Sequence, residues 1–425
     1  MSNKYKLICT ACGADCGDFS DWFAHDQKCS CGCQRAEAVY NSDYSKLFEG
    51  EGFEDSLFRY FDFLPLEDRA NVVSCGEGAE PIEEWDFLEN YAKEKHGVDC
   101  KVFVVRNDLN GGSGTFKDIA AALGASIFKE KGVKNFCLAS TGNAATAFSR
   151  YCAQAGVTFD VFMPNDVCKD TADTIRSHGQ ILHISQGGYG AAKKEAADFH
   201  VRENVLISAG NIDPIRVEAK RTMAFEFLRQ LGKMPDVFFQ AVAGGTGPIA
   251  LDKGVRELQK YYDKNIKMPR LILAQQDTCD PLVRAWEKAT AENFPKGWEK
   301  DFPTVIPQTK ISILSAGTPG MYPVVAPMVR ATKGGFVRVQ ESELAGLAKK
   351  IQEQTGVIFG PASMVCFAAP ALQAGGQRFE SVILHVFVRK RIDAVNPISD
   401  TLMMDGVNPA LDTVGVPKRK RSLTY

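Results

Sequence analysis

The strongest constraint on the fold is a regular alternation of short apolar runs with longer helix-like runs, which begins near residue 101. The short runs are rich in β-branched and aromatic residues, as β-strands are. The predicted strands cover 102–106, 135–139, 157–163, 180–185, 205–209, 236–243 and 270–276. The predicted helices cover 116–131, 144–155, 189–203, 215–231, 248–262 and 280–292. Strands and helices in this order predict an α/β fold of βαβ units, with mostly parallel sheets covered by helices.

The length and charge of the chain narrow the classes of protein to consider. Its 425 residues are enough for about two or three domains. The formal net charge is −2, so charge gives no reason to expect nucleic acid or an anionic membrane as a partner. No apolar run approaches the roughly 20 residues that cross a bilayer, and the first residues lead into no signal sequence. We therefore expect a cytoplasmic protein that binds no membrane, with a solvated basic terminus at 418–421.

Six of the 13 cysteines fall in the first 33 residues. Two closely spaced pairs, Cys9 with Cys12 and Cys29 with Cys31, have spacings that suit a four-cysteine zinc ribbon. In a reducing cytoplasm a local cluster of this kind is more typical of a metal site than of disulfides. The sequence predicts a zinc-ribbon-like segment at 1–39 with a structural zinc, since all four ligands would come from the protein. A ribbon that keeps its shape without metal, or a set of labile thiols, is the alternative.

The first turn of interest follows the predicted strand 102–106 and covers residues 110–118, with three glycines and Lys117. This lysine stands at the start of an alanine-rich helix, against a packed sheet. Both surroundings disfavour its charged form, so its pKa should fall. A neutral amine is what a nucleophilic or Schiff-base lysine needs. Taken alone, the pattern also fits an ordinary solvated lysine at the start of a helix.

The second turn covers residues 140–143, Ser-Thr-Gly-Asn, and precedes a helix whose first residues are small. The free N–H groups at such a helix start favour an anion, for example the carboxylate of a small molecule. Ser, Thr and Asn also cap helices without binding any ligand, and that reading fits equally well.

The third turn covers residues 244–248, Gly-Gly-Thr-Gly-Pro, after the predicted strand 236–243. A glycine-rich loop with proline at the start of the next helix can cradle a phosphate. The loop is no P-loop, because the Gly-Lys-Ser/Thr ending is missing.

Together the three turns offer a lysine, a carboxylate site and a phosphate site. Pyridoxal phosphate with an amino-acid substrate requires these three groups.

Four motifs resemble those of fold-type II pyridoxal-phosphate enzymes. Residues 113–118 resemble the "GSFKD" lysine motif, and 139–143 are similar to the loop for substrate carboxylate and cofactor ring. Residues 244–247 resemble the phosphate-binding loop, and 361–363 the segment beside the pyridine nitrogen. The resemblance implies two αβα domains with the cofactor in the cleft between them.

Within this fold type the chain most resembles threonine synthase. The cysteine-rich head of that family is similar to residues 9–33, its "RY…LPL" segment to 59–66, and its "GEG…P" segment to 76–81. Its "NPxRxEGQKT" stretch resembles residues 213–222. These motifs occur in the expected order along the chain, so the resemblance implies an enzyme that acts on a small amino-acid substrate.

The resemblance assigns a role to each motif residue. It implies that Lys117 holds the cofactor and moves protons. The residues implied to bind the cofactor are Lys117, Phe116, Asn143, Gly244, Gly245, Thr246, Gly247, and either Ser363 or Cys366 at the pyridine nitrogen. The residues implied to bind the substrate are Ser140, Thr141, Gly142, Asn143, Ala144, Arg216 and Tyr322. Arg216 would hold the substrate's phosphate, because its charge and forked geometry suit that group.

Three departures from the threonine synthase pattern bear on the substrate. Ile119 stands where the family usually has arginine, and Gly245 and Pro248 stand where its phosphate loop often has asparagines. Residues 317–323 also differ from the family's "GNPxNW" run. The resemblance implies loss of phosphate from O-phosphohomoserine and addition of water to give threonine. The alternative is cysteate synthase, or a cysteine-synthase-like β-replacement on O-phosphoserine.

The sequence also predicts a domain division. Residues 40–117 and 226–425 should form the larger, cofactor-binding domain, and 118–225 the smaller one with the carboxylate loop. The resemblance implies a homodimer. A remote alternative is a binding protein that acts through its zinc ribbon and keeps an inactive enzyme fold, but such a protein would have no need of Lys117 and its three loops.

Overall fold

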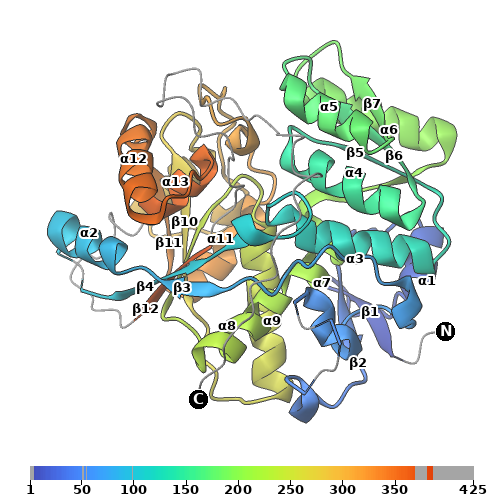
Figure 1. Ribbon diagram of the computed structural model, residues 1–425, viewed down its shortest axis with the longest axis horizontal. Coiled ribbons are helices and arrows are strands. Elements are labelled where there is room, and N and C mark those ends of the chain that lie inside the picture. Colours follow the sequence, from blue (N-terminus) through green and yellow to red (C-terminus); the bar gives the residue numbers. More distant parts are fainter. Residues whose placement is uncertain (1–3, 50–51, 54, 98, 369–380, 386–425) are drawn as a thin grey trace.

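The computed structural model describes most of the chain, namely residues 4–49, 52–53, 55–97, 99–368 and 381–385. The basic terminus and the last part of the predicted larger domain lie outside these residues. The described residues form two separate α/β sheets and a small N-terminal hairpin (Figure 1). No helix in these ranges is long and apolar enough to cross a membrane.

A four-stranded parallel sheet, with the strand order β7-β6-β5-β8, forms one part of the molecule. Its strands are β5 (Asn135–Ala139), β6 (Thr158–Met163), β7 (Ile181–Ile184) and β8 (Leu206–Ile207). Its helices are α4 (Asn143–Ala155), α5 (Lys169–Ser177) and α6 (Tyr189–Glu203). Each helix follows a strand and returns the chain to the same end of the sheet, which is the geometry of βαβ units. This part is green in Figure 1, at the upper right.

A six-stranded sheet, in the order β11-β10-β9-β12-β4-β3, is parallel except for its edge strand β3. Its strands are β3 (Ile82–Glu84), β4 (Lys101–Val105), β9 (Val237–Ala241), β10 (Arg270–Gln276), β11 (Gly335–Val339) and β12 (Ser381–His385). The helices associated with it are α2 (Asp86–His96), α9 (Thr246–Tyr261), α10 (Pro281–Ala291), α11 (Tyr322–Ala331), α12 (Leu344–Thr355) and α13 (Pro361–Ala368). In chain order, β3 and β4 belong to this sheet, β5 to β8 form the four-stranded sheet, and β9 to β12 belong to this sheet again.

The N-terminal segment is a hairpin of two antiparallel strands, β1 (Tyr5–Cys9) and β2 (Ala36–Tyr40), with the short helix α1 (Phe19–Ala24) between them. Asp18 begins α1, because its carboxylate accepts hydrogen bonds from the backbone of Ser20 and Asp21. Short 3₁₀ helices cover Tyr44–Lys46, Leu57–Phe63, Arg69–Asn71, Asn107–Leu109, Gly210–Ile212, Trp298–Lys300, Ser312–Leu314 and Glu341–Glu343.

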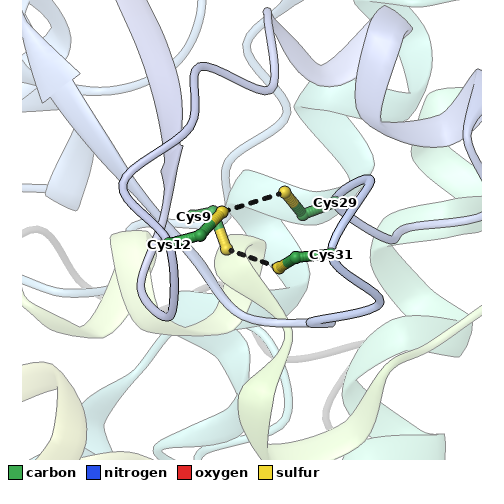
Figure 2. A group of neighbouring side chains, drawn as sticks. All are labelled: Cys9, Cys12, Cys29 and Cys31. Carbon is green, nitrogen blue, oxygen red and sulfur yellow. Dashed lines mark hydrogen bonds between the residues drawn. The ribbon is translucent and has the colours of Figure 1, made fainter.

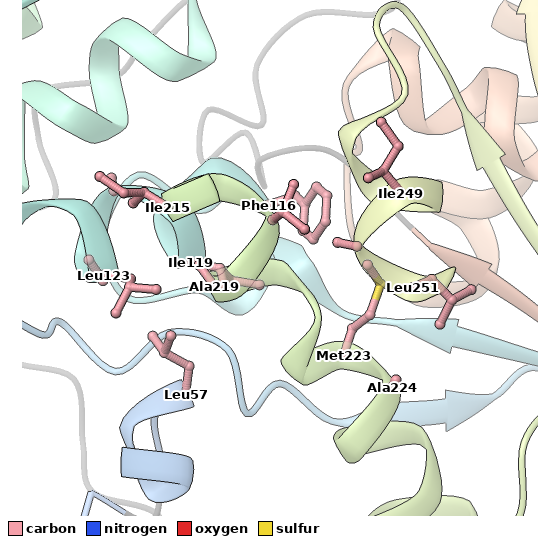
Figure 3. Packing of buried hydrophobic residues seen from close by; sticks show 14 of the residues in the cluster. Leu57, Phe116, Ile119, Leu123, Ile215, Ala219, Met223, Ala224, Ile249 and Leu251 are labelled. Carbon is pink, nitrogen blue, oxygen red and sulfur yellow. The ribbon is translucent and has the colours of Figure 1, made fainter. Parts of the chain in front are cut away.

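The helices α3 (Lys117–Glu130), α7 (Pro214–Lys220) and α8 (Thr222–Leu231) lie at the centre of the largest hydrophobic core. Figure 3 shows α7 crossing beside the first turns of α3, with Ile215 and Ala219 close to Ile119 and Leu123. Small and branched side chains on the two facing surfaces allow this close approach. The packing brings the polar residues of α7 near the first residue of α3.

The predicted strands are all present, and their ends agree with the structure to within two residues. One predicted helix is wrong: 215–231 is divided into α7 and α8 at Arg221. The backbone of Arg221 keeps helical dihedral angles, and its buried side chain binds Glu218 one turn back and the Phe63 carbonyl oxygen. The domain boundaries at 118 and 226 stay predictions.

Candidate active site

The loop before α3 is held in shape by the carboxylate of Asp118. This group accepts hydrogen bonds from the Ser113 backbone nitrogen at 2.9 Å, the Ser113 hydroxyl at 2.7 Å and the Thr115 backbone nitrogen at 3.0 Å. Burial raises the pKa of Asp118 to about 6. The folded loop therefore presents Lys117 as the first residue of α3, in a fixed place.

Lys117 lies in a cluster of cationic side chains. Its own side chain is partly buried, and burial together with the charge of Arg216 lowers its pKa to about 8. The Lys220 amine lies 4.5 Å from the centre of the Phe116 ring, and the Lys117 amine 5.9 Å from the same centre. Two lysines thus share one aromatic ring, and α7 supplies both Arg216 and Lys220. An amine that is neutral for part of the time near neutral pH can act as nucleophile or proton carrier.

The second turn joins β5 to α4. The Ser140 hydroxyl accepts hydrogen bonds from the backbone nitrogens of Gly142 at 3.1 Å and Ala145 at 3.2 Å, so it caps the turn from inside. Ser140 and Gly142 are buried, whereas the other site residues of the turn are partly exposed: Thr141, Asn143 and Ala144. The exposed start of a 13-residue helix is a place where an anion can be held by backbone N–H groups.

The third turn joins β9 to α9. Gly245 has a φ of +88°, a left-handed conformation that favours glycine, and begins the helix. A Cβ atom at Gly244 would lie only 1.9 Å from the side-chain nitrogen of Asn211, so a larger residue there would displace the Asn211 amide. The Thr246 hydroxyl donates a hydrogen bond of 2.8 Å to the Asn211 oxygen. Gly247 is buried in the first helical turn, and the whole turn resembles a backbone cradle for an anion.

Ser363 and Cys366 both lie on α13 and are fully buried. The Cys366 sulfur contacts the Phe239 carbonyl oxygen at 3.5 Å. The Ser363 hydroxyl oxygen has no hydrogen-bond partner among the described residues. A buried hydroxyl without a partner is costly, and it is expected where a ligand completes the site.

Tyr322 is the first residue of α11. It has no exposed surface and packs edge-on against Trp298 and Phe302, with Phe336 also close. The Tyr322 hydroxyl, like that of Ser363, has no hydrogen-bond partner among the described residues, and the predicted contact of Tyr322 with the substrate stays a prediction.

The four cysteines of the predicted metal site come together at one end of the hairpin, as Figure 2 shows. The sulfur atoms of Cys9, Cys12, Cys29 and Cys31 all lie within 4.8 Å of one another. The Cys9–Cys31 and Cys12–Cys29 sulfur distances are both 3.6 Å. Four sulfurs at these separations can surround one tetrahedral ion.

Two polar residues near the site were missed by the sequence analysis. Asn211 belongs to a 3₁₀ turn and meets the third loop only because of the folding of the chain, so no local signal marks it. Lys220 could have been found from the sequence, because it is a lysine at the position where the "NPxRxEGQKT" pattern has glutamine.

The α/β fold and the chemistry of the three turns indicate a class of protein, the α/β enzymes that bind pyridoxal phosphate. Residues 73–388 match the family model described as "Pyridoxal-phosphate dependent enzyme". This match covers well over half of the chain, and the chain belongs to that family.

Curated relatives of similar sequence are threonine synthases and cysteate synthases. The threonine synthase of Methanocaldococcus jannaschii is 25% identical over 346 residues, which cover 79% of this chain and 80% of that protein. The threonine synthase of Halalkalibacterium halodurans is 25% identical, with 84% and 93% covered. The cysteate synthase of Methanoregula boonei is 24% identical, with 87% and 85% covered. The chain is therefore a threonine- and cysteate-synthase-like member of its family.

Solved structures support the fold. Threonine deaminase isoform 2 from Solanum lycopersicum superimposes with a TM-score of 0.59 at 16% identity, covering 81% of this chain and 91% of that one. Maize serine racemase gives a TM-score of 0.60 at 14% identity, covering 76% and 90%. At these identities the likeness establishes the fold, which is fold type II.

Proposed function

We propose that this enzyme removes phosphate from an O-phospho amino acid, O-phosphohomoserine, and adds water to give threonine. The observation that carries the proposal is the cationic cluster of Lys117, Arg216 and Lys220 beside the loop that holds Lys117. A phosphorylated side chain supplies the negative charge that such a cluster favours. The similarity to threonine synthases supports the same substrate.

The residues present fit pyridoxal phosphate. Lys117 has the lowered pKa that a cofactor-binding lysine needs, and Phe116 lies next to its amine. The cradle from Gly244 to Gly247 would hold the cofactor phosphate, and Asn143 would contact the ring. Ser363 is the better candidate for the pyridine nitrogen than Cys366, because its hydroxyl has no other partner in the described chain. When bound, the cofactor supplies an electron sink for the substrate's α carbon.

The chain's own residues would then divide the work. Thr141 and the backbone N–H groups at Asn143 and Ala144 would hold the substrate carboxylate, while Ser140 keeps this turn in shape. Lys117 would take a proton from the substrate and later return one, since its pKa near 8 suits both steps. Arg216 would bind the phosphate before it leaves.

A β-replacement on O-phosphoserine, as in a cysteate synthase, is the second candidate. Its support is the similarity to the cysteate synthase of Methanoregula boonei and the departures from the threonine synthase pattern at Ile119, at Gly245 and Pro248, and at residues 317–323. Both reactions start with a phosphorylated amino acid, so the cationic cluster suits either one. A homodimer and a cytoplasmic location stay predictions from the sequence.

We also propose that the four-cysteine cluster binds one structural zinc ion. The sulfur separations and the absence of an open ligand position in a four-cysteine set support this proposal. The ion would join the β1 end of the hairpin to the segment after α1, and would contribute to the folding of the head.

The experiment that tests the function is a titration of the cofactor-loaded enzyme with phosphorylated amino acids, followed by the visible absorption of the cofactor. O-phosphohomoserine should change the spectrum and yield threonine and inorganic phosphate, whereas O-phosphoserine should yield neither product. The reverse preference would favour β-replacement. If neither compound changes the spectrum, the proposal of a phosphorylated substrate is wrong.

A further inference from the structure

Lys220 is a buried lysine of the cluster described above, but the proposed chemistry gives it no role of its own. It is the last residue of α7, is only 2% exposed, and places its amine over the Phe116 ring. In the described ranges its amine has neither a hydrogen bond nor a carboxylate at ion-pair distance. Burying an ammonium group without a counter-ion is costly, so such a residue needs a reason to be there.

The charges around Lys220 do not compensate it. Burial and the neighbouring charges of Lys117 and Arg216 hold the pKa of Lys220 well below its usual value. Asp213 is the acidic group that acts in the other direction, but its carboxylate already caps α7 through the Ile215 backbone nitrogen at 3.0 Å. Burial also raises the pKa of Asp213, which weakens it as a counter-ion. Three basic side chains therefore face a single acidic one, and an incoming anion would resolve the imbalance.

The other anion-binding positions are formed by different elements. The cradle for the cofactor phosphate lies at the start of α9 and is tied to Asn211. The carboxylate position lies at the start of α4. Arg216 and Lys220 share one short helix, one turn apart, and α7 packs beside the start of α3.

We propose that Lys220 is a specificity-determining residue that binds the anionic end of the substrate's side chain together with Arg216. This inference rests on the proposed function and deepens it. Beside Arg216, Lys220 would supply a second positive charge, which would favour a doubly charged phosphate ester over an uncharged or singly charged side chain. The glutamine of the family pattern at this position could give a hydrogen bond but no charge.

The test compares the cofactor-loaded wild type with Lys220→Met, since methionine has a similar length and no charge. A matched control is Lys134→Met, because Lys134 is exposed. The dissociation constants of O-phosphohomoserine and of homoserine would be measured by calorimetry or by the cofactor spectrum. Loss of a charge-assisted hydrogen bond should weaken O-phosphohomoserine by about tenfold or more in Lys220→Met. Homoserine binding should change by less than about twofold, because it has no anionic end.

A second readout separates binding from folding. Without substrate, Lys220→Met should melt at the same temperature as the wild type or higher, because the substitution removes an uncompensated buried amine. Added O-phosphohomoserine should raise the melting temperature of the wild type and raise that of Lys220→Met much less.

The outcomes distinguish this inference from the proposed function. If the wild type prefers O-phosphohomoserine to homoserine and Lys220→Met keeps that preference in full, the role of Lys220 is refuted while the proposed function stands. If Lys220→Met binds substrate normally but loses turnover or the cofactor band, Lys220 acts on the cofactor and the inference is again wrong. If the wild type itself shows no preference for a phosphorylated side chain, the proposed function fails first.

Discussion

At the scale of single residues, the crowding of basic groups explains why Lys117 is suited to its role. A lysine on the surface is protonated at neutral pH, whereas burial and the Arg216 charge bring the pKa of Lys117 to about 8. The neutral fraction of such an amine rises as the pH rises through this value. The same Arg216 that would bind phosphate therefore also prepares the lysine.

The pH dependence of cofactor capture tests this coupling. For the protein freed of cofactor, the rate of reaction with pyridoxal phosphate should rise with pH around a midpoint near 8. In Arg216→Gln the midpoint should move upward by about one unit, because a neighbouring positive charge is gone. Stopped-flow absorption at a series of pH values measures it, with the exposed Arg202→Gln as control. An unchanged midpoint in Arg216→Gln would show that Arg216 does not act on Lys117.

At the scale of elements, a buried ion-pair network joins the N-terminal hairpin to the helix of the cationic cluster. Glu218 on α7 accepts hydrogen bonds from the backbone nitrogen of Ala38 at 2.8 Å and the Tyr40 hydroxyl at 2.7 Å, both on β2. It also pairs with Arg221 at 2.7 Å and with Lys253 of α9 at 2.6 Å. One carboxylate thus holds three elements together and fixes the orientation of α7.

Removing this carboxylate should destabilise the protein strongly. Glu218→Gln leaves Arg221 and Lys253 buried with less compensation, so we expect a loss of about 3 kcal/mol in the free energy of unfolding. Although burial alone would raise the pKa of Glu218, Lys253 and Arg221 keep it below the usual value. The stabilisation is therefore present above the ordinary carboxyl range, and it should disappear as the pH falls through the lowered pKa.

Thermal and denaturant unfolding of the variant and the wild type measure the loss. The matched control is Asp198→Asn, which breaks an exposed pair with Lys194 and should cost less than about 1 kcal/mol. Equal effects of the two substitutions would contradict the role given to the Glu218 network.

The cysteine cluster gives a second prediction at this scale. The purified protein should contain about one zinc ion per chain, and Cys29→Ser should lose it. Cys33→Ser should retain zinc, because Cys33 lies in the same segment but outside the group of four. Metal analysis by mass spectrometry measures both. Full zinc content in Cys29→Ser, or none in the wild type, would refute the site.

Some elements could be predicted from the sequence and others could not. Strands such as 135–139 and 270–276 are marked by dense runs of apolar residues between helical stretches, and both are found as predicted. The break at Arg221 has no signal in the sequence pattern, and the contact of the Arg221 side chain with Phe63 joins residues that lie far apart in the sequence. The strand β12 was also missed, since its place between β4 and β9 is a pairing over more than 140 residues on one side and more than 270 on the other.

At the scale of the whole molecule, residues far apart in the sequence approach one another through α3 and α7. The loop at Lys117 follows β4 of the six-stranded sheet. Helix α4 follows β5 of the four-stranded sheet, and α9 follows β9 of the six-stranded sheet. Each of these three motifs could be predicted from the sequence, because its functional residues lie within a few positions of one another. The approach of Lys220 to Phe116 and the approach of Asn211 to Thr246 could not be predicted, because both depend on how the chain packs.

We propose that Lys117, and not the nearby Lys220, holds the cofactor. The most direct test of this claim is borohydride reduction of the cofactor-loaded enzyme, which fixes a pyridoxyl group on the lysine that holds the cofactor, followed by peptide mass spectrometry. We predict a single labelled peptide with the pyridoxyl group on Lys117, and no label in Lys117→Ala. Label on Lys220, or an unlabelled protein after incubation with pyridoxal phosphate, would contradict the claim.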